Sequence, residues 1–146
     1  MDFLNKRYLL LISFSFQSMQ EIAAGKIVVK KSRFFAHLYT INQKEDIQEI
    51  IEKHHSRYNK ANHHCYALRL SKQKNSLIED FSDDGEVGRP GRVLLQILNN
   101  HHLSNHALVV SRVFGGIKLG VGGVSRAFRE VGEGVVLYHK NPNKEK

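Results

Sequence analysis

The stretch HALVVSRVFGGIKLGVGGVSRAF, residues 106–128, contains the change of pattern that sets the fold. Apolar and β-branched residues predict a strand over 106–114. A helix is predicted next, over 124–138, because four apolar residues share one stripe there: Val124, Phe128, Val131 and Val135. Glycine is kept where a chain needs positive φ or close backbone approach. The glycine loop between the two elements must therefore lie against a phosphate, a nucleic acid or another part of the chain.

This loop has only the general layout of a phosphate cradle, with backbone N–H groups and a helix N-terminus facing one way. Gly115 and Gly120 have the spacing of a Walker motif, but Val121 follows them where Lys is required. Ser125 stands at the last position of an incomplete G-x-G-x-x-G. A looser anion or nucleic-acid site stays open beside simple helix–sheet packing. Its candidate contacts are Arg112, Gly115, Gly116, Lys118, Gly120, Gly122, Gly123 and Arg126.

Upstream of the loop, the acidic segment SDDGE, residues 82–86, is the second candidate feature. Its carboxylates, Asp83, Asp84 and Glu86, could hold a divalent metal or act as acid and base. An Asp-Gly pair is also an ordinary turn signal. The favoured interpretation is a turn whose carboxylates accept backbone N–H bonds from the glycine loop, and no metal or cofactor is expected.

The segment ANHHCYAL, residues 61–68, predicts a strand on which His63 and Cys65 share one face. A cysteine beside a histidine could be a nucleophile, but side chains two apart on a strand lie too far apart for a direct hydrogen bond. The favoured interpretation of Cys65 is a small buried hydrophobe, and paired histidines without a Cys-x-x-Cys do not favour zinc. Cys65 is the only cysteine, which fits a reducing compartment and predicts a cytoplasmic protein.

The remaining pattern is a mixture of strands and helices. Residues 26–41 predict one bent strand or two short ones, with Phe34, Ala36 and Leu38 on one face and Phe35, His37 and Tyr39 on the other. A helix over 42–58 is expected to start at an Asn42–Glu45 capping box and to carry the stripe Ile47, Ile50, Ile51 and Tyr58. Further elements are a strand at 63–70, an exposed turn at 71–76, a strand at 77–81 and a short buried helix at 92–98. The whole predicts a two-layer α+β domain over 21–140, with a tail at 141–146.

Residues 1–20 are treated as an extension. Lys6 and Arg7 precede the apolar run Tyr8–Phe16, which is too short to span a bilayer, although it has the size of a signal peptide. The favoured interpretation is sequence upstream of a natural start at Met19, with an extra strand on the sheet and a secretion signal as the alternatives.

Charge narrows the class of partner. In the 146 residues, 22 Lys and Arg stand against 14 Asp and Glu, a formal charge of +8. This excess favours partners with negative charge, such as RNA, DNA, ribosomes or phosphorylated metabolites, with a soluble basic protein that has no such site as the alternative. Besides Arg112, Lys118 and Arg126 at the loop, Lys30, Lys31 and Arg33 are candidate contacts.

Three motifs in order, ANHHCYAL, DDGE and VVSRVFGGIKLGVGG, resemble the YigZ/IMPACT family, over about Lys26 to Tyr138. The matching residues are Ala61, His63, Cys65, Tyr66 and Ala67, then Asp83, Asp84, Gly85 and Glu86, then Arg112, Phe114, Gly115, Gly116, Lys118, Leu119, Gly120 and Gly123. One departure is VGRPGRVLL, residues 87–95, which replaces the Pro and Thr-Ala-Gly stretch of the bacterial members and is one residue shorter.

The resemblance implies a four-stranded mixed sheet with helices on one face, similar to the second domain of a small-subunit ribosomal protein. It also implies a role near translation and brings no established reaction. The leading hypothesis is a binding module for RNA or a ribosome-associated partner, with no membrane partner. The rival is a small enzyme on a phosphorylated or nucleotide-like ligand, using His63 with Asp83, Asp84 and Glu86 as acid–base groups. Regulation through protein contacts alone is the third hypothesis.

Overall fold

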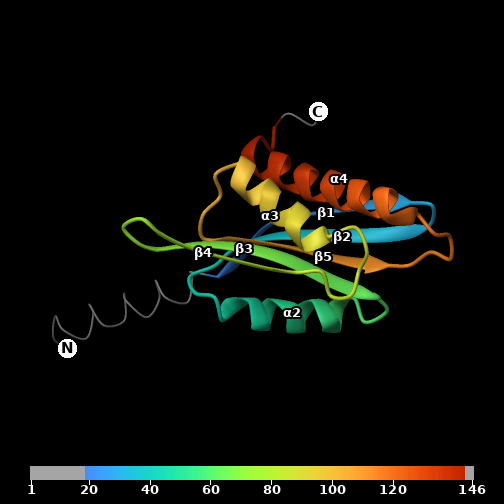
Figure 1. The fold of residues 1–146 in the computed structure, drawn as a ribbon, viewed down its shortest axis with the longest axis horizontal. Helices are drawn as coiled ribbons and strands as arrows, with labels where there is room; N and C mark the ends of the chain where they lie inside the picture. The colour runs from blue at the N-terminus through green and yellow to red at the C-terminus, as the bar shows by residue number, and fades with distance from the viewer. Residues whose placement is uncertain (1–18, 144–146) are drawn as a thin grey trace.

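The computed structural model describes residues 19–143, where five strands form one sheet and three helices cover it (Figure 1). The strands are β1 (Gln20–Val29), β2 (Ser32–Thr40), β3 (His63–Gln73), β4 (Ser76–Ser82) and β5 (His106–Val113). The helices are α2 (Asp46–Arg57), α3 (Pro90–Asn100) and α4 (Gly120–Lys140). None of these helices combines the length and apolar character needed to cross a membrane. The predictions about Tyr8–Phe16 and sequence upstream of Met19 lie outside the described residues.

The sheet confirms the α+β class and differs from the expected sheet in detail. Its strand order is β1-β2-β5-β3-β4, and every neighbouring pair is antiparallel rather than mixed. The fifth strand arises because residues 26–41 do not form one bent strand. The chain reverses at Lys30 and Lys31, and a strand from Gln20 pairs with the one that follows.

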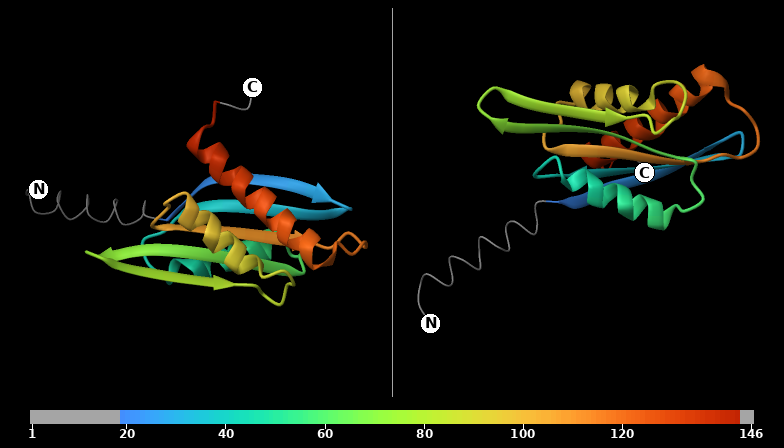
Figure 2. Two further views of the ribbon diagram at one scale, coloured as in Figure 1. Left: turned by 45° about the horizontal axis from the view of Figure 1, so that its top comes forward. Right: turned by 60° about the horizontal axis from the view of Figure 1, so that its bottom comes forward.

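Helices cover both faces of the sheet, not one. In Figure 1 and the two views of Figure 2, α3 and α4 lie on one side and α2 lies on the other. The predicted alternation along β2 is confirmed, since Phe34, Ala36 and Leu38 pack in the core beneath α3 and α4. Tyr39 belongs to a second cluster beneath α2, with Ile47 and Ile50. Each face of the sheet therefore has its own core.

Helix α2 begins later than its sequence pattern predicted. The Asn42–Glu45 capping box is wrong, because Glu45 makes no side-chain cap and the helix starts at Asp46. The Asp46 carboxylate instead accepts the backbone N–H groups of Asn42 and Gln43, at 2.8 and 3.1 Å. These bonds hold the preceding residues in a turn outside the helix.

Two glycines in α4 behave differently. A glycine inside a helix weakens it by roughly 1 kcal/mol relative to alanine, a cost that tight packing can offset. Tight packing is found at Gly132, where a Cβ would lie 2.9 Å from Ile97 and 3.2 Å from Leu94. At Gly134, no atom of residues 19–143 lies within 4 Å of such a Cβ.

Gly134→Ala is therefore expected to stabilise the protein by about 0.5–1 kcal/mol, because alanine loses less backbone entropy in a helix. Urea unfolding measures the change. Gly132→Ala is the matched control and should destabilise, since its methyl group meets packed side chains. A loss of stability in Gly134→Ala would contradict the open space at that position.

Candidate functional site

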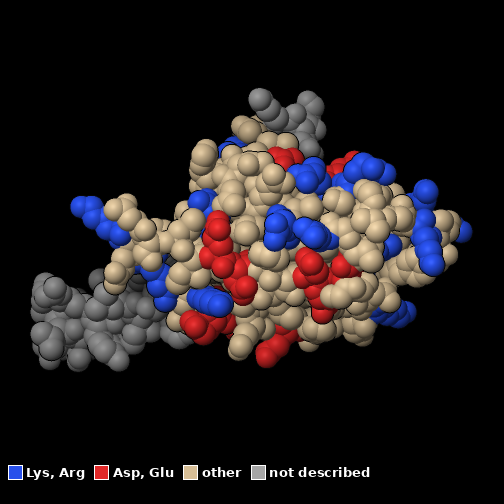
Figure 3. All heavy atoms as spheres, viewed as in Figure 1, with Lys and Arg blue, Asp and Glu red and all other residues tan. Residues whose placement is uncertain are grey.

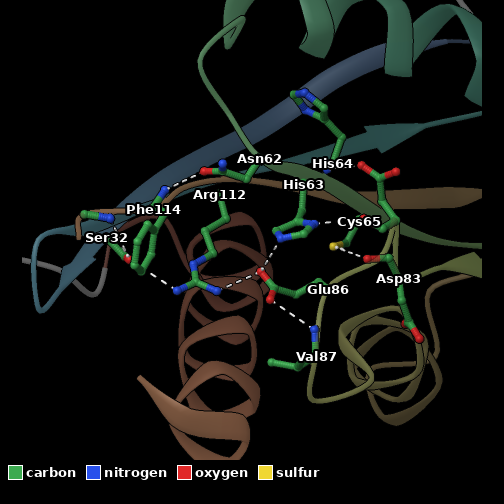
Figure 4. A network of polar contacts seen from close by, with 12 residues as sticks. Ser32, Asn62, His63, His64, Cys65, Asp83, Glu86, Val87, Arg112 and Phe114 are labelled. Atoms are coloured by element: carbon green, nitrogen blue, oxygen red, sulfur yellow. Dashed lines mark hydrogen bonds and ion pairs between the residues drawn. The ribbon is translucent and has the colours of Figure 1, made fainter. Parts of the chain in front are cut away.

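The acidic turn and the end of β5 meet in a buried ion pair, which Figure 4 shows from close by. The Nη1 group of Arg112 donates to Glu86 Oε2 at 2.8 Å. The two side chains are only 7% and 4% exposed. In a site of low dielectric each charge depends on the other for its stabilisation. The pair thus connects β5 to the turn that follows β4.

Arg112 makes further contacts that fix its position. Its Nη2 group donates to Ser32 Oγ at 3.3 Å, and the same oxygen accepts the Gly115 N–H at 3.2 Å. The guanidinium lies 5.4 Å from the ring centre of Phe34 and 5.7 Å from that of Phe114. Arg112 therefore ties the glycine loop to the start of β2 and does not extend into solvent.

The aspartates of the acidic turn accept backbone N–H bonds, but from other donors than the glycine loop. Asp84 Oδ2 accepts the His64 N–H at 2.7 Å, at the start of β3. Asp83 Oδ1 accepts the Gly91 N–H at 2.8 Å, in the first turn of α3. Asp84 also has a positive φ of 47°, a conformation that needs such support. The two carboxylates thus join the turn to β3 and α3.

His63 and Cys65 face this turn from β3. The His63 Nδ1 atom is 2.8 Å from the Asp84 carbonyl oxygen, and Nε2 is 3.6 Å from Glu86 Oε2. The thiol of Cys65 is fully buried and donates to the Asp83 carbonyl at 3.2 Å. Burial raises the pKa of this thiol, and the carboxylates of Glu86, Asp84 and Asp83 add to the rise. A thiol held protonated is a packing group rather than a nucleophile.

Gly115 is the glycine with the closest approach to another segment. A Cβ at this position would lie 2.1 Å from the carbonyl carbon of Lys31 and 2.5 Å from the Ser32 nitrogen. Only glycine therefore lets the loop lie against the turn between β1 and β2. Gly116 and Gly120 have positive φ values of 91° and 75°, and no other part of the described chain lies within 4 Å of a Cβ placed on either.

Exposed cations surround this contact between loop and turn. Lys30, Lys31, Lys118 and Arg126 are all exposed. Lys30, Arg126 and Arg129 line a groove of about 560 Å³ between the turn and α4, which Glu130 and Glu133 also line. Figure 3 shows Lys and Arg atoms at this end of the molecule and elsewhere on the same face, with acidic atoms lower down, over β4 and α2, and also beside cations over α4. We call Lys30, Lys31, Lys118, Arg126 and Arg129 the basic end.

The structure thus divides the candidates of the sequence into two groups. His63, Asp83, Asp84, Glu86 and Arg112 form one internal network, whereas Lys118 and Arg126 face solvent with Gly116, Gly120 and Gly122. Gly123 is half-buried, in the groove beside Arg126. Ligand binding by Arg112, Lys118, Arg126 and the glycines Gly115, Gly116, Gly120, Gly122 and Gly123 stays a prediction, as does acid–base chemistry by His63, Asp83, Asp84 and Glu86. Within residues 19–143, no group of three or more His, Cys, Asp or Glu side chains is arranged to hold a metal ion.

A second polar cluster, which the sequence did not indicate, lies between the sheet and α2. His37 Nδ1 is 2.6 Å from Glu21 Oε1, and Nε2 is 2.6 Å from the Tyr58 hydroxyl. A register shift between Glu21 and Ala23 gives β1 one extra residue there. This bulge brings Glu21 opposite Tyr39, on the α2 side of the sheet, where its carboxylate reaches His37.

The same cluster continues through a serine. The Tyr39 hydroxyl is 2.9 Å from His54 Nε2, and His54 Nδ1 is 2.7 Å from Ser111 Oγ. Ser111 Oγ is also 2.7 Å from His64 Nδ1. One hydroxyl therefore links α2 to β3 through two imidazoles.

Burial lowers the pKa of His37, His54 and His64, that of His54 to about 3. All three are therefore neutral at pH 7. A cavity of about 800 Å³ adjoins the cluster and is lined by His37, Tyr39 and His54, with side chains of both charges from α2. His54 lies at helical spacing from the buried residues Ile47 and Ile50, so the sequence could have placed it on the buried stripe. It was missed because a polar residue is not expected on such a stripe.

The sequence of this chain is similar to those of known proteins. The family model described as the Impact N-terminal domain matches residues 30–136. The IMPACT family member YvyE of Bacillus subtilis is 37% identical over 123 residues, which cover 83% of this chain and 56% of that protein. Protein IMPACT-B of Xenopus tropicalis is 37% identical over 99 residues, 64% of this chain and 30% of that protein.

Two solved structures are similar. A crystal structure of a hypothetical protein has a TM-score of 0.74 at 30% identity, covering 79% of this chain and 56% of that one. The two-domain translational regulator Yih1 has a TM-score of 0.55 at 26% identity, covering 85% of this chain and 48% of that one. The chain therefore spans about half the length of its bacterial relative and of these two structures.

Proposed function

Since this chain belongs to the family of Impact N-terminal domains, we propose that it is a translation-linked module that binds ribosomal RNA through its basic end. A role in translation is supported by the similar structure of Yih1, which is described as a translational regulator. A net charge of +8 supports a polyanionic partner.

The observation that carries this proposal is the turn between β1 and β2. Lys30 and Lys31 are its two central residues, with positive φ values of 46° and 68°. A two-residue hairpin turn of this type favours Asn-Gly, and a lysine in the left-handed region costs about 1 kcal/mol or more. Two exposed lysines at such positions are disfavoured for the fold alone. A contact of their ammonium groups with phosphate gives them a function.

Apolar side chains near these cations also support a contact surface. Phe114 and Ile117 of the glycine loop are 44% and 43% exposed, and Val121 at the start of α4 is 61% exposed. Exposed apolar side chains that lie close together often mark a surface that a partner covers. An RNA loop offers both phosphates for the cations and base faces for apolar groups.

Replacing Lys30 by Asn and Lys31 by Gly together tests the proposal. The Asn-Gly turn is expected to stabilise the fold by about 1 kcal/mol or more and at the same time to weaken RNA binding. Loss of two phosphate contacts should lower affinity at least about tenfold at 0.1 M salt. It should also reduce by about 1.5 the salt slope, which is the steepness with which the logarithm of the binding constant falls with the logarithm of the salt concentration. Urea unfolding gives the stability, and filter binding to ribosomal RNA across a salt series gives the slope.

The hairpin at the opposite end of the sheet provides a matched control. Lys72→Gln with Lys74→Gln removes the same charge from the exposed end of β3 and its turn. This variant should lose much less affinity than the turn variant. Equal losses of affinity in the two variants would show that RNA binding depends on net charge alone, and this would contradict a binding site at the basic end. Cosedimentation with ribosomes that persists without any RNA affinity would point to a ribosomal protein as partner and would also overturn the proposal.

A further inference from the structure

A second exposed surface, on the α2 side of the sheet, carries aromatic side chains instead of glycines. The rings of Phe35 on β2 and Tyr58 at the end of α2 are stacked, with centroids 4.4 Å apart and planes 20° apart. Both side chains are half-buried, so part of each ring reaches solvent. Such a pair offers a flat apolar area at the molecular surface.

Cations surround this aromatic pair. Lys26 Nζ lies 5.6 Å and Arg33 Cζ 6.0 Å from the centre of the Phe35 ring. The guanidinium of Arg57 lies 5.4 Å from the centre of the Tyr58 ring. Among residues 19–143, none of these three cations forms an ion pair. We call the five residues the aromatic surface.

The fold holds Tyr58 in place from behind. Its hydroxyl is bonded to His37 Nε2 at 2.6 Å, and Glu21 holds the opposite side of that imidazole at 2.6 Å. The β1 bulge places Glu21 on this side of the sheet. The orientation of the Tyr58 ring is therefore set before any partner arrives, which reduces the entropy lost on binding.

We propose that the aromatic surface binds single-stranded RNA, with an unpaired base stacked on the Phe35–Tyr58 pair and its phosphates on Lys26, Arg33 and Arg57. This inference rests on the proposed function for its RNA partner but uses none of the residues of the basic end. Aromatic stacking accepts any unpaired base, whereas the bases of a duplex are not available to it. The flexible stems of Lys26 and Arg33 let a base replace their charged ends against the ring.

The position of the surface makes it continuous with the basic end. Arg33 is only two residues from Lys31, roughly 7 Å along an extended strand. One RNA strand can therefore contact the lysine turn and continue across the edge of the sheet to the aromatic pair. The basic end would bind phosphates of any RNA, and the aromatic surface would select unpaired segments.

The test compares two labelled RNAs of equal length, an unstructured oligouridine and a duplex, by fluorescence anisotropy at fixed salt. Phe35→Leu should weaken binding of oligouridine about fivefold or more and leave duplex binding within twofold. Phe81→Leu is the matched control, because Phe81 is a half-exposed β4 aromatic with Arg92 lying 5.8 Å from its ring centre. This control should bind both RNAs like the parent. Circular dichroism and urea unfolding confirm that each variant is folded.

A charge variant keeps the test decisive if Phe35→Leu does not fold. Arg33→Gln with Arg57→Gln should reduce the salt slope for oligouridine by about 1.4, the effect of two phosphate contacts to a single strand. Folded aromatic or charge variants that bind oligouridine like the parent would overturn this inference, while duplex binding that still depends on Lys30 and Lys31 would leave the proposed function standing. Absence of binding to either RNA by the parent protein would overturn both.

Discussion

Arg112→Met is expected to lower the free energy of unfolding by about 3–5 kcal/mol, because it leaves a buried carboxylate without its counterion. Glu86 is 4% exposed, and its other ionic neighbour, His63 Nε2, is 3.6 Å away and cannot replace a guanidinium at 2.8 Å. Methionine keeps an unbranched apolar side chain but removes the guanidinium that lies 5.4 Å from the ring centre of Phe34 and 5.7 Å from that of Phe114. Urea unfolding at pH 7 measures the loss.

Two controls separate charge from volume in this experiment. The double variant Arg112→Met with Glu86→Leu removes both charges and should recover most of the lost stability. Arg129→Met removes an exposed arginine that, among the described residues, is bonded only to Gln96, at 3.3 Å, and it should change stability by less than about 0.5 kcal/mol. A loss below about 1 kcal/mol in Arg112→Met would mean that Glu86 is solvated in the folded protein.

The second large effect is a loss of stability on acidification. Burial lowers the pKa of His54 from 6.5 to about 3, and it also lowers the pKa of His37 and His64. The unfolded chain therefore binds more protons than the folded one between pH 6.5 and the lowered values. The contribution of these histidines to the free energy of unfolding is therefore most favourable above pH 6.5, and the free energy of unfolding decreases as the pH falls below that value. For His54 the slope is about 1.4 kcal/mol per pH unit, which amounts to several kcal/mol by pH 3.

Urea unfolding of the parent and of His54→Gln at pH 7, 6, 5 and 4 measures this slope. The variant is expected to be less stable at pH 7, because Tyr39 and Ser111 lose a hydrogen-bond partner. Its stability should fall less steeply with decreasing pH, because unfolding of the variant takes up about one proton fewer than unfolding of the parent. His102→Asn changes an exposed histidine in the turn after α3 and serves as the control, with the slope of the parent. Parallel slopes for the parent and His54→Gln would show that His54 is not the group that resists protonation.

Local patterns predicted much of this molecule. The alternation of Phe34, Ala36 and Leu38 against Phe35, His37 and Tyr39 was readable because a strand has a period of two residues. The same argument placed His63 and Cys65 together on one face. The strand and helix around the glycine loop were also predicted, although α4 begins at Gly120, four residues earlier than its apolar stripe.

Long-range pairing could not be predicted in the same way. Arg112 is predicted from the sequence as a ligand contact, and its bond to Glu86 could not be predicted, because Glu86 lies 26 residues away and only the assembled sheet brings the two together. Arg33 was grouped with Lys30 and Lys31, yet its side chain lies near Phe35 on the other side of the sheet. A polar residue such as His54 joins a core only where hydrogen-bond partners converge on it, and no local pattern shows where that happens.

The bridge at Ser111 has a consequence for the two rings that it joins. A hydroxyl carries a single proton, so it can donate to only one of the two imidazoles, and the other must carry its own proton on Nδ1 and donate to the serine oxygen. If Ser111 donates to His64, then His54 carries its proton on Nδ1 and receives one from Tyr39 at Nε2. If Ser111 donates to His54, then His64 carries its proton on Nδ1. The two neutral rings therefore cannot both lack a proton on Nδ1, and loss of the Nδ1 proton from the ring on α2 requires one on the ring of β3 without any movement of the backbone.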